Sequence, residues 1–336
     1  MNAFEFYLDK FRLRASLAVL IVGLSASTCA AQEITEFQVG RHNTEAFLIN
    51  SAGVVAGSFD GHDHGTTSLF MRDANGTITK FIIAGSGQSY LAGINDKSSI
   101  AGGYYSDSAY HGFLRTTDGR VTRFDAGTGG DTNPTGINDN GDIVGSFYTV
   151  GAAVGFIRAS DGTITTFNAP DGGDSIYPAC INNQGVTVGY DIDAKEVGHG
   201  FLRAKDGTIT LIDPPGSLYT AATWINKQGD VVGDYRDGNR IFRGFHRTPD
   251  GTITRFDVPG SRTTYFTGIN NRGSISGYFY NDIFAHAFVL QSSGRFFPIN
   301  GGKYYSYAYG ISDNDLVVGY DILDKRERAY GFVGKP

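Results

Sequence analysis

Short runs of apolar residues alternate with polar and glycine-rich segments from about residue 33 to the end of the chain. In the sixth copy of this pattern the runs occupy 264–269, 274–280 and 285–290, and the preceding copy adds a run at 252–257. Asn-Asn-Arg-Gly at 270–273 and Pro-Asp-Gly at 249–251 join neighbouring runs, and glycine in these segments suits a tight hairpin turn. Each copy therefore predicts four short antiparallel strands.

The copies keep a constant register, which is marked by an asparagine at the end of the first strand. A period near 44 residues with strand-type content is typical of four-stranded propeller blades. Helical repeats of this length need apolar residues at a 3.6 period, and the copies contain no such stretch. The register positions are spaced 42 to 45 residues apart, at Asn50, Asn95, Asn138, Asn182, Asn226, Asn270 and Ser312.

The fourth strand of each copy carries apolar residues on both faces. Ile164 and Phe167 stand three apart and so point to opposite sides of a pleated strand, and later copies repeat the arrangement. Burial of both faces is expected when a sheet lies between two neighbouring blades. We predict an all-β fold, a seven-bladed β-propeller of four-stranded antiparallel blades.

The two ends of the repeat region complement each other. The last copy stops at 330–333, before its fourth strand, and 34–37 matches the fourth strand at 78–81. We expect the N- and C-terminal strands to pair within one blade, which closes the ring and removes exposed sheet edges. Residues 32–336 are thus predicted to form one domain. The alternative, an open β solenoid, needs no such complementary split.

Residues 1–31 differ in kind from the repeats and predict a signal peptide. Lys10, Arg12 and Arg14 precede the apolar run 15–26, and small residues lead to a cleavage site after Ala30 or Ala31. The run is too short for a membrane span, although a retained anchor is the alternative. We expect a secreted or periplasmic protein with no membrane span after cleavage.

Composition and charge restrict the partners. The 47 glycines and 43 Phe and Tyr residues fit many short strands joined by tight turns. The net charge is −6 and no basic run occurs, which excludes a typical nucleic-acid partner. Cys180 is the cysteine that remains after cleavage, so no intrachain disulfide is expected. We expect a monomer.

The third strand of several copies begins with histidine and contains phenylalanine, as in His286-Ala287-Phe288-Val289. Together with the His-Gly-Phe-Leu versions at 111–114 and 199–202, this resembles the HAF family of probable extracellular repeat proteins. The resemblance covers nearly the whole chain after the signal peptide and implies an exported, propeller-type scaffold without an established general activity. The histidine is replaced in the other copies, by Ser68, Val154, Arg243 and Tyr330.

The aligned histidines His111, His199 and His286 do not predict a metal site. They fall in alternate blades, and packed sheets stand about 10 Å apart, far beyond the reach of one zinc ion. We expect them to have a structural or hydrogen-bonding role. The arginines that end the third strands are likewise expected to pair or stack, at Arg72, Arg115, Arg158, Arg203 and Arg247.

Two other segments contain candidate metal ligands. The segment 138–142 resembles a calcium loop, but its copies at 182–185 and 226–229 lack the carboxylates, so a β turn is the better interpretation. Asp60, His62 and His64 lie together in a connection that is not repeated, and they form a weak hypothesis for a divalent metal; a solvated loop is the alternative. No other cofactor is expected.

The longer connections of all blades are expected on one face of the disk, where their varied sequences favour binding. Tyrosines before the register asparagine, with charged residues from the longer loops, predict a ring at the channel mouth that stacks on a sugar or contacts a protein. The alternative is that the rings only fill space between blades. The predicted ligand-binding residues are Tyr90, Tyr177, Asp191, Tyr219, Arg236, Asp237, Tyr265, Tyr307 and Asp321.

The sequence contains no nucleophile elbow, phosphate-binding glycine loop or zinc hydrolase motif. The first hypothesis is therefore an exported binding or interaction scaffold for an extracellular glycan or protein. The second is a carbohydrate-active propeller enzyme, a lyase or hydrolase, with its site on the long-loop face. A surface structural protein is the third.

Overall fold

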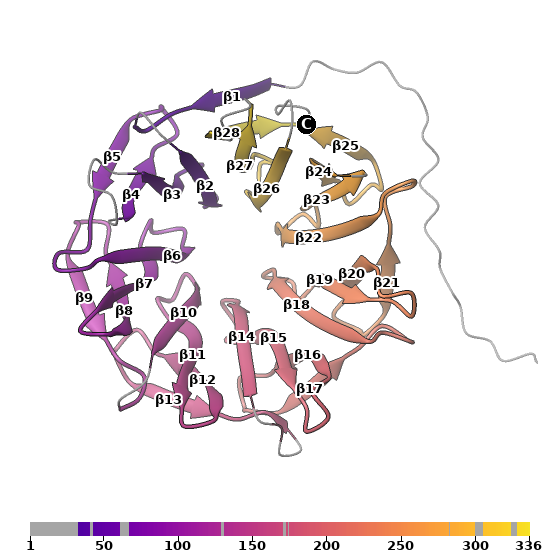
Figure 1. Ribbon diagram of the computed structural model, residues 1–336, viewed down its shortest axis with the longest axis horizontal. Helices are drawn as coiled ribbons and strands as arrows, with labels where there is room; N and C mark the ends of the chain where they lie inside the picture. The colour runs from indigo at the N-terminus through magenta and orange to yellow at the C-terminus, as the bar shows by residue number, and fades with distance from the viewer. Residues whose placement is uncertain are drawn as a thin grey trace, which may run out of the picture.

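The computed structural model describes residues 33–40, 43–60, 67–128, 131–170, 173, 175–281, 283–299, 305–323 and 328–336. These residues form seven four-stranded antiparallel sheets, each a blade, arranged in a ring around a central axis (Figure 1). The prediction of a seven-bladed β-propeller is confirmed. The predicted signal peptide, 1–31, lies outside the described residues. None of the described residues forms a helix with the length and hydropathy of a membrane span.

Each blade runs from an inner strand at the channel to an outer strand at the rim. Blade A comprises β2 (Thr44–Ile49), β3 (Val55–Asp60), β4 (Thr67–Arg72) and β5 (Ile78–Phe81). Blade B comprises β6 (Gln88–Ile94), β7 (Ile100–Ser106), β8 (Ala109–Arg115) and β9 (Val121–Phe124). Blade C comprises β10 (Thr132–Ile137), β11 (Ile143–Thr149), β12 (Ala152–Arg158) and β13 (Ile164–Phe167).

The second half of the ring repeats this order. Blade D comprises β14 (Ser175–Ile181), β15 (Thr187–Ile192), β16 (Gly198–Arg203) and β17 (Ile209–Ile212). Blade E comprises β18 (Tyr219–Ile225), β19 (Val231–Arg236), β20 (Phe242–Arg247) and β21 (Ile253–Phe256). Blade F comprises β22 (Thr263–Ile269), β23 (Ile275–Asn281), β24 (Phe284–Leu290) and β25 (Phe296–Ile299). Blade G contains β26 (Tyr305–Ile311), β27 (Val317–Ile322), β28 (Ala329–Lys335) and β1 (Glu33–Phe37).

Blade G joins the two ends of the chain and closes the ring, as the sequence predicted. The outer strand β1 pairs with β28 in an antiparallel register that runs from Glu33 opposite Lys335 to Phe37 opposite Gly331. In Figure 1 the two strands lie side by side at the rim. The closing blade thus depends on contacts between residues about 300 positions apart in the chain.

Every inner strand has a β-bulge at the same place. The bulge explains why the second strand of every blade has a glycine opposite it. In blade C the pairing of β10 with β11 shifts register between Pro134 and Gly136. Opposite the bulge, a Cβ on Gly145 would lie 2.2 Å from the carbonyl oxygen of Asn133 and 2.8 Å from the ring of Phe156. The other blades place Gly57, Gly102, Gly189, Gly233, Gly277 and Gly319 in the same environment.

The third strands supply the core and hold the outer strand. Their phenylalanines are fully buried between blades, at Phe70, Phe113, Phe156, Phe201, Phe245, Phe288 and Phe332. The guanidinium groups of Arg115 and Arg158 stack on Phe81 and Phe124 of the preceding blade, at 4.6 and 5.1 Å from the ring centroids. The expected stacking role is confirmed for Arg72, Arg115, Arg158 and Arg203.

Two of the three aligned histidines, each near the start of a third strand, pair with an aspartate after the fourth strand. His111 Nδ1 lies 2.7 Å from Asp125 Oδ1, and His199 Nδ1 lies 2.7 Å from Asp213 Oδ2. In blade E, Arg243 replaces the histidine and pairs with Asp257. His111 and His199 therefore join the third strand to the end of the fourth, in agreement with the expected hydrogen-bonding role, whereas His286 packs on Phe279.

Candidate functional site

The central channel has two different ends. Inner strands begin at the face that carries the longer connections, which we call the loop face, and end at the tight turns on the opposite turn face. The loop face carries the connections between blades, such as 82–87, 213–218 and 257–262, and the connections from the second to the third strand. The latter are five residues long at 193–197 and 237–241, but in blades B and C they are two-residue turns, at 107–108 and 150–151, so the expected longer loop is absent there. The turn face includes 50–54, 95–99, 138–142 and 226–230.

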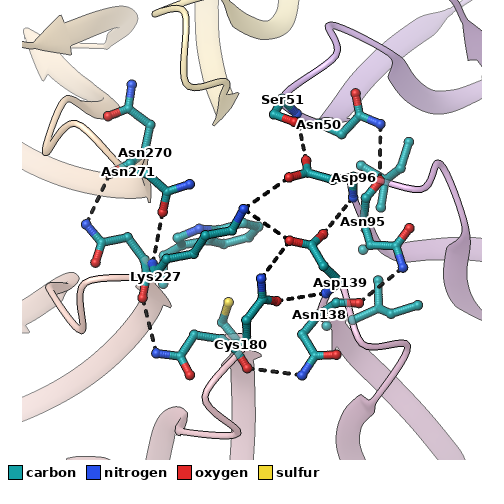
Figure 2. Close-up of a pocket in the computed structure, with 18 of the residues that line it drawn as sticks. Asn50, Ser51, Asn95, Asp96, Asn138, Asp139, Cys180, Lys227, Asn270 and Asn271 are labelled. Carbon is teal, nitrogen blue, oxygen red and sulfur yellow. Dashed lines mark hydrogen bonds and ion pairs between the residues drawn. The ribbon is translucent and has the colours of Figure 1, made fainter. Parts of the chain in front are cut away.

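A hollow of about 130 Å³ lies at the turn end of the channel. The register asparagines line it, and they are hydrogen-bonded from blade to blade (Figure 2). Asn182 Nδ2 donates to the Asn226 carbonyl at 3.2 Å, while its Oδ1 accepts from the backbone N–H groups of Gln184 and Val186. The same blade-to-blade bond starts from Asn50, Asn95, Asn138, Asn226 and Asn270.

Lys227 crosses the opening of this hollow. Its Nζ lies 3.1 Å from Asp96 Oδ2 and 3.1 Å from Asp139 Oδ2, so that blade E is tied to blades B and C (Figure 2). Burial lowers the pKa of Lys227, but the hydrogen bonds that its ammonium group donates to both carboxylates outweigh burial, and the pKa is raised. The charged and amide side chains that line the hollow are thus paired with one another, and these pairs connect the blades.

Trp224 fills part of the channel next to this hollow. Its position corresponds to Gly93, Gly136, Gly268 and Gly310 in other blades, and it packs against the cores of blades D, E and F. A smaller cavity of about 20 Å³ lies beside Trp224, with walls of Ile49, Ile94 and other apolar residues. The other candidate site is the loop end of the channel, where the tyrosines gather.

Tyrosines form a continuous arc at the loop end. Tyr177 stacks on Tyr190 at 4.9 Å, and the contacts continue through Tyr219 and Phe242 to Tyr265. Further contacts connect Tyr278, Tyr307, Tyr320, Tyr309 and Phe47, so the arc covers blades D, E, F, G and A. These tyrosines are half-buried, so each offers a partly exposed ring and hydroxyl group. The structure brings Tyr177, Tyr219, Tyr265 and Tyr307 together in this arc.

Tyr90 and Arg236 also face the mouth. Tyr90 packs on Tyr110 and its hydroxyl donates to Asn133 Oδ1 at 3.3 Å. Arg236 lies opposite Tyr219 in the pairing of β19 with β18 and interacts electrostatically with it. Asp237 instead organises its own loop, since its Oδ1 accepts from the N–H groups of Asn239 and Ile241.

The structure corrects the expected positions of Asp191 and Asp321. Both were expected at the rim with the tyrosines, but they are only 2% and 0% exposed. Each follows a channel-facing tyrosine, Tyr190 or Tyr320, and successive residues of a strand point to opposite faces. Burial raises the pKa of Asp191 to about 6 and that of Asp321 to about 7. They occupy positions at which the other blades carry Phe or Tyr.

Sequence reasoning missed two carboxylates that lie among the tyrosines. Asp234 interacts electrostatically with Tyr219, Tyr265 and Tyr278, and burial raises its pKa to about 7. Glu45 interacts with tyrosines of blade G, and burial followed by repulsion from Asp60 raises its pKa. Alignment of the copies gives a signal for both, because each stands where other blades have Tyr.

Among the described residues, the structure adds no candidate ligand to the metal site hypothesised at Asp60, His62 and His64. Asp60 is the exposed last residue of β3, whereas His62 and His64 lie outside the described residues. Among the residues that the structure describes, no three His, Cys, Asp or Glu side chains gather as a metal site would require. Cys180 is buried, and burial raises the pKa of its thiol to about 11.

Comparison with known proteins supports the fold. No protein-family model and no curated protein matches the sequence. A catalytically inactive virginiamycin B lyase from Staphylococcus aureus with quinupristin is 15% identical, with a TM-score of 0.56, and the match covers 90% of this chain and 99% of that one. The resemblance to the HAF family stays a prediction.

Two further solved structures are similar in fold. The β-propeller domain of the Trilobed protease from Pyrococcus furiosus is 9% identical, with a TM-score of 0.65 over 87% of this chain and 95% of that one. Puromycin hydrolase is 14% identical, with a TM-score of 0.64 over 88% of this chain and 52% of that one. At these identities the likeness is one of fold, so the class defined here is a seven-bladed β-propeller.

Proposed function

We propose that the protein is an exported β-propeller that binds an extracellular glycan at the loop end of its channel. The observation that supports this function is the arc of half-buried tyrosines across blades D, E, F and G, which Phe47 extends into blade A. Aromatic rings stack on the apolar faces of sugars while phenol hydroxyls and carboxylates bond to sugar hydroxyls. The hollow at the turn end is a weaker candidate because its polar groups are already paired.

The first experiment is a glycan array with the purified chain, followed by calorimetric titration of each hit. We expect Tyr177→Ala and Tyr219→Ala each to weaken binding about tenfold or more, since truncation of a central aromatic typically costs more than 1 kcal/mol. Tyr330→Ala is the matched control, because Tyr330 is also half-buried but lies on β28, away from the tyrosine arc. Binding that survives both arc variants, or no glycan hit at all, contradicts the proposal.

A second function, a carbohydrate-active lyase or hydrolase, is favoured by Asp234. A carboxyl group with a pKa of about 7 beside tyrosine hydroxyls has the acidity that a general acid or base needs near neutral pH. Incubation of the bound glycan with wild type and with Asp234→Asn tests this function. New reducing ends or unsaturated products with wild type alone support the enzyme, and their absence with wild type supports the binding protein.

A further inference from the structure

Asp234 stands in blade E where three other blades carry a tyrosine. The second strands of blades D, F and G place Tyr190, Tyr278 and Tyr320 at this position. Each ring packs on the inner-strand tyrosine opposite it, at centroid distances of 4.9, 5.1 and 5.2 Å. In blade E the inner strand has Ala221 opposite Asp234. Blade E thus presents a carboxylate where its neighbours present a pair of rings.

The carboxylate of Asp234 accepts a hydrogen bond but has no counter-ion among the described residues. The backbone N–H of Phe266 donates to Asp234 Oδ1 at 3.2 Å. Within the described part of the chain, no Lys or Arg side chain forms an ion pair with Asp234. An unpaired carboxylate away from water is costly, so a cation brought by a ligand is stabilised beside it.

The groups around Asp234 suit an organic cation. The faces of tyrosine rings attract cations, and burial raises the pKa of each neighbouring phenol, so these rings are neutral at ordinary pH. On β20, Gly244 lies opposite Asp234. Arg236 lies two residues along β19 on the same face, opposite Tyr219. The tyrosines that interact with Asp234 are Tyr219 on β18, Tyr265 on β22 and Tyr278 on β23.

The rest of the mouth is acidic as well. Glu45 interacts electrostatically with Tyr309 and Tyr320, and Asp131 interacts with Tyr90 and accepts a hydrogen bond from the Tyr110 N–H. These carboxylates add to the field of Asp234, and the whole chain carries a net charge of −6. Such a field attracts a cationic ligand and repels a polyanionic one.

We propose that the glycan bound at this mouth contains amino sugars, and that Asp234 binds the ammonium group of one of them beside the surrounding tyrosine rings. This inference rests on the proposed glycan-binding function and names its ligand class. A charge-assisted hydrogen bond from the ammonium group to Asp234, together with cation–π attraction, distinguishes an amino sugar from its N-acetylated or uronate counterpart.

Binding of the ammonium group requires the ionised form of Asp234. Since the pKa of this carboxyl group lies at about 7, a fraction of the free protein is protonated at neutral pH and loses that proton to solvent when the ligand binds. Affinity for the amino sugar therefore rises as pH increases from about 6 to 7, and it falls again at higher pH when the sugar amine loses its own proton.

The test is calorimetric titration with a glucosamine oligomer and with the N-acetylated oligomer of the same length, at pH 7 and low salt. We expect the glucosamine oligomer to bind about tenfold more tightly. Asp234→Asn removes this preference and leaves the weaker binding of the acetylated oligomer within about twofold. Glu196→Gln, which removes an exposed charge from the same face, is the matched control and retains the preference.

Two results overturn the inference: equal or tighter binding of the acetylated oligomer, or an unchanged preference in Asp234→Asn. In both cases a glycan still binds, so the proposed function stands. Titration of wild type at pH 6 in two buffers of different ionisation enthalpy gives a readout that needs no variant, because there the sugar amine already carries its proton while Asp234 still has one to lose. Net proton release with the glucosamine oligomer supports the inference, and its absence overturns it. If no glycan binds at all, the proposed function fails together with the inference.

Discussion

Lys227 Nζ of blade E lies 3.1 Å from Asp96 Oδ2 of blade B, although the two residues are 131 positions apart in the chain. The bond crosses the turn end of the channel, so it connects parts of the ring that share no sheet. Cyclic propellers gain stability when neighbouring blades pack, and this pair adds a tie between blades that are not neighbours.

Lys227→Met should lower the free energy of unfolding by about 0.5–1 kcal/mol, because both partners are partly exposed and water screens them. Burial raises the pKa of Asp96, but hydrogen bonds from Ser51 and Lys227 outweigh it and the pKa is lowered. This stabilisation is present above about pH 4 and is lost as pH falls further. Urea unfolding at pH 7 and pH 3 checks both points. If the free energies of unfolding of wild type and Lys227→Met still differ at pH 3, the argument is contradicted.

Gly145→Ala should destabilise the protein by about 3 kcal/mol or more, because the added Cβ meets the Asn133 carbonyl oxygen at 2.2 Å and the Phe156 ring. Gly238→Ala is the control, since a Cβ there meets no atom within 4 Å. Its effect should stay within about 0.5 kcal/mol. Thermal and urea unfolding of both variants measure the difference, and equal stability of the two would show that the bulge tolerates a side chain.

Ser312→Asn should stabilise the protein by about 1 kcal/mol, because it supplies the blade-to-blade hydrogen bond that blade G lacks. In the other six blades the register asparagine donates to the next blade's carbonyl. Asn182→Ala is the opposite variant and should cost about 2 kcal/mol, since it leaves buried backbone groups without partners. Chemical unfolding ranks the three proteins; Ser312→Asn below wild type would contradict the argument.

The pairing of His199 predicts a pH dependence of stability. Burial lowers the pKa of His199, but Asp213 and Asp193 outweigh burial and raise it. The protonated pair therefore contributes stability that is fully present below the unfolded pKa of about 6.5 and is lost as pH rises through the folded value. The stability difference between wild type and His199→Gln should shrink from pH 6 to pH 8. Thermal unfolding across that range measures it, and a constant difference would refute the pairing.

The repeat explains how much of the fold was predictable. Strand periodicity, turn glycines and the match of 34–37 to 78–81 predicted seven blades and their closure, because each is a local property that all copies share. The predicted strand at 285–290 differs from β24 (Phe284–Leu290) by one residue. The spacing also predicted that the tyrosines gather, because residues at corresponding positions of the repeat lie at the same level along the channel.

The site itself was only partly predictable. Asp191 and Asp321 have the composition of rim residues, but strand alternation turns them away from the channel into the packing between blades. Alignment of the copies shows that Asp234 replaces a tyrosine, but only the structure shows that it lies beside tyrosines without a counter-ion among the described residues. Charge pairing across the ring, as between Lys227 and Asp96, has no sequence signal because both partners lie in ordinary turns.

The sequence by itself determined what is repeated: the blade, its strands and turns, the glycine opposite the bulge and the closing strand. Short-range sterics and strand alternation control the blade, so it can be read from the residues of one copy, while comparison of the first and last copies shows the closing strand. Only the tertiary structure decided what differs between copies, namely which carboxylates face the tyrosines, which are buried and which end of the channel has satisfied polar groups. Those properties depend on distances between blades, and ring closure sets such distances across the whole chain.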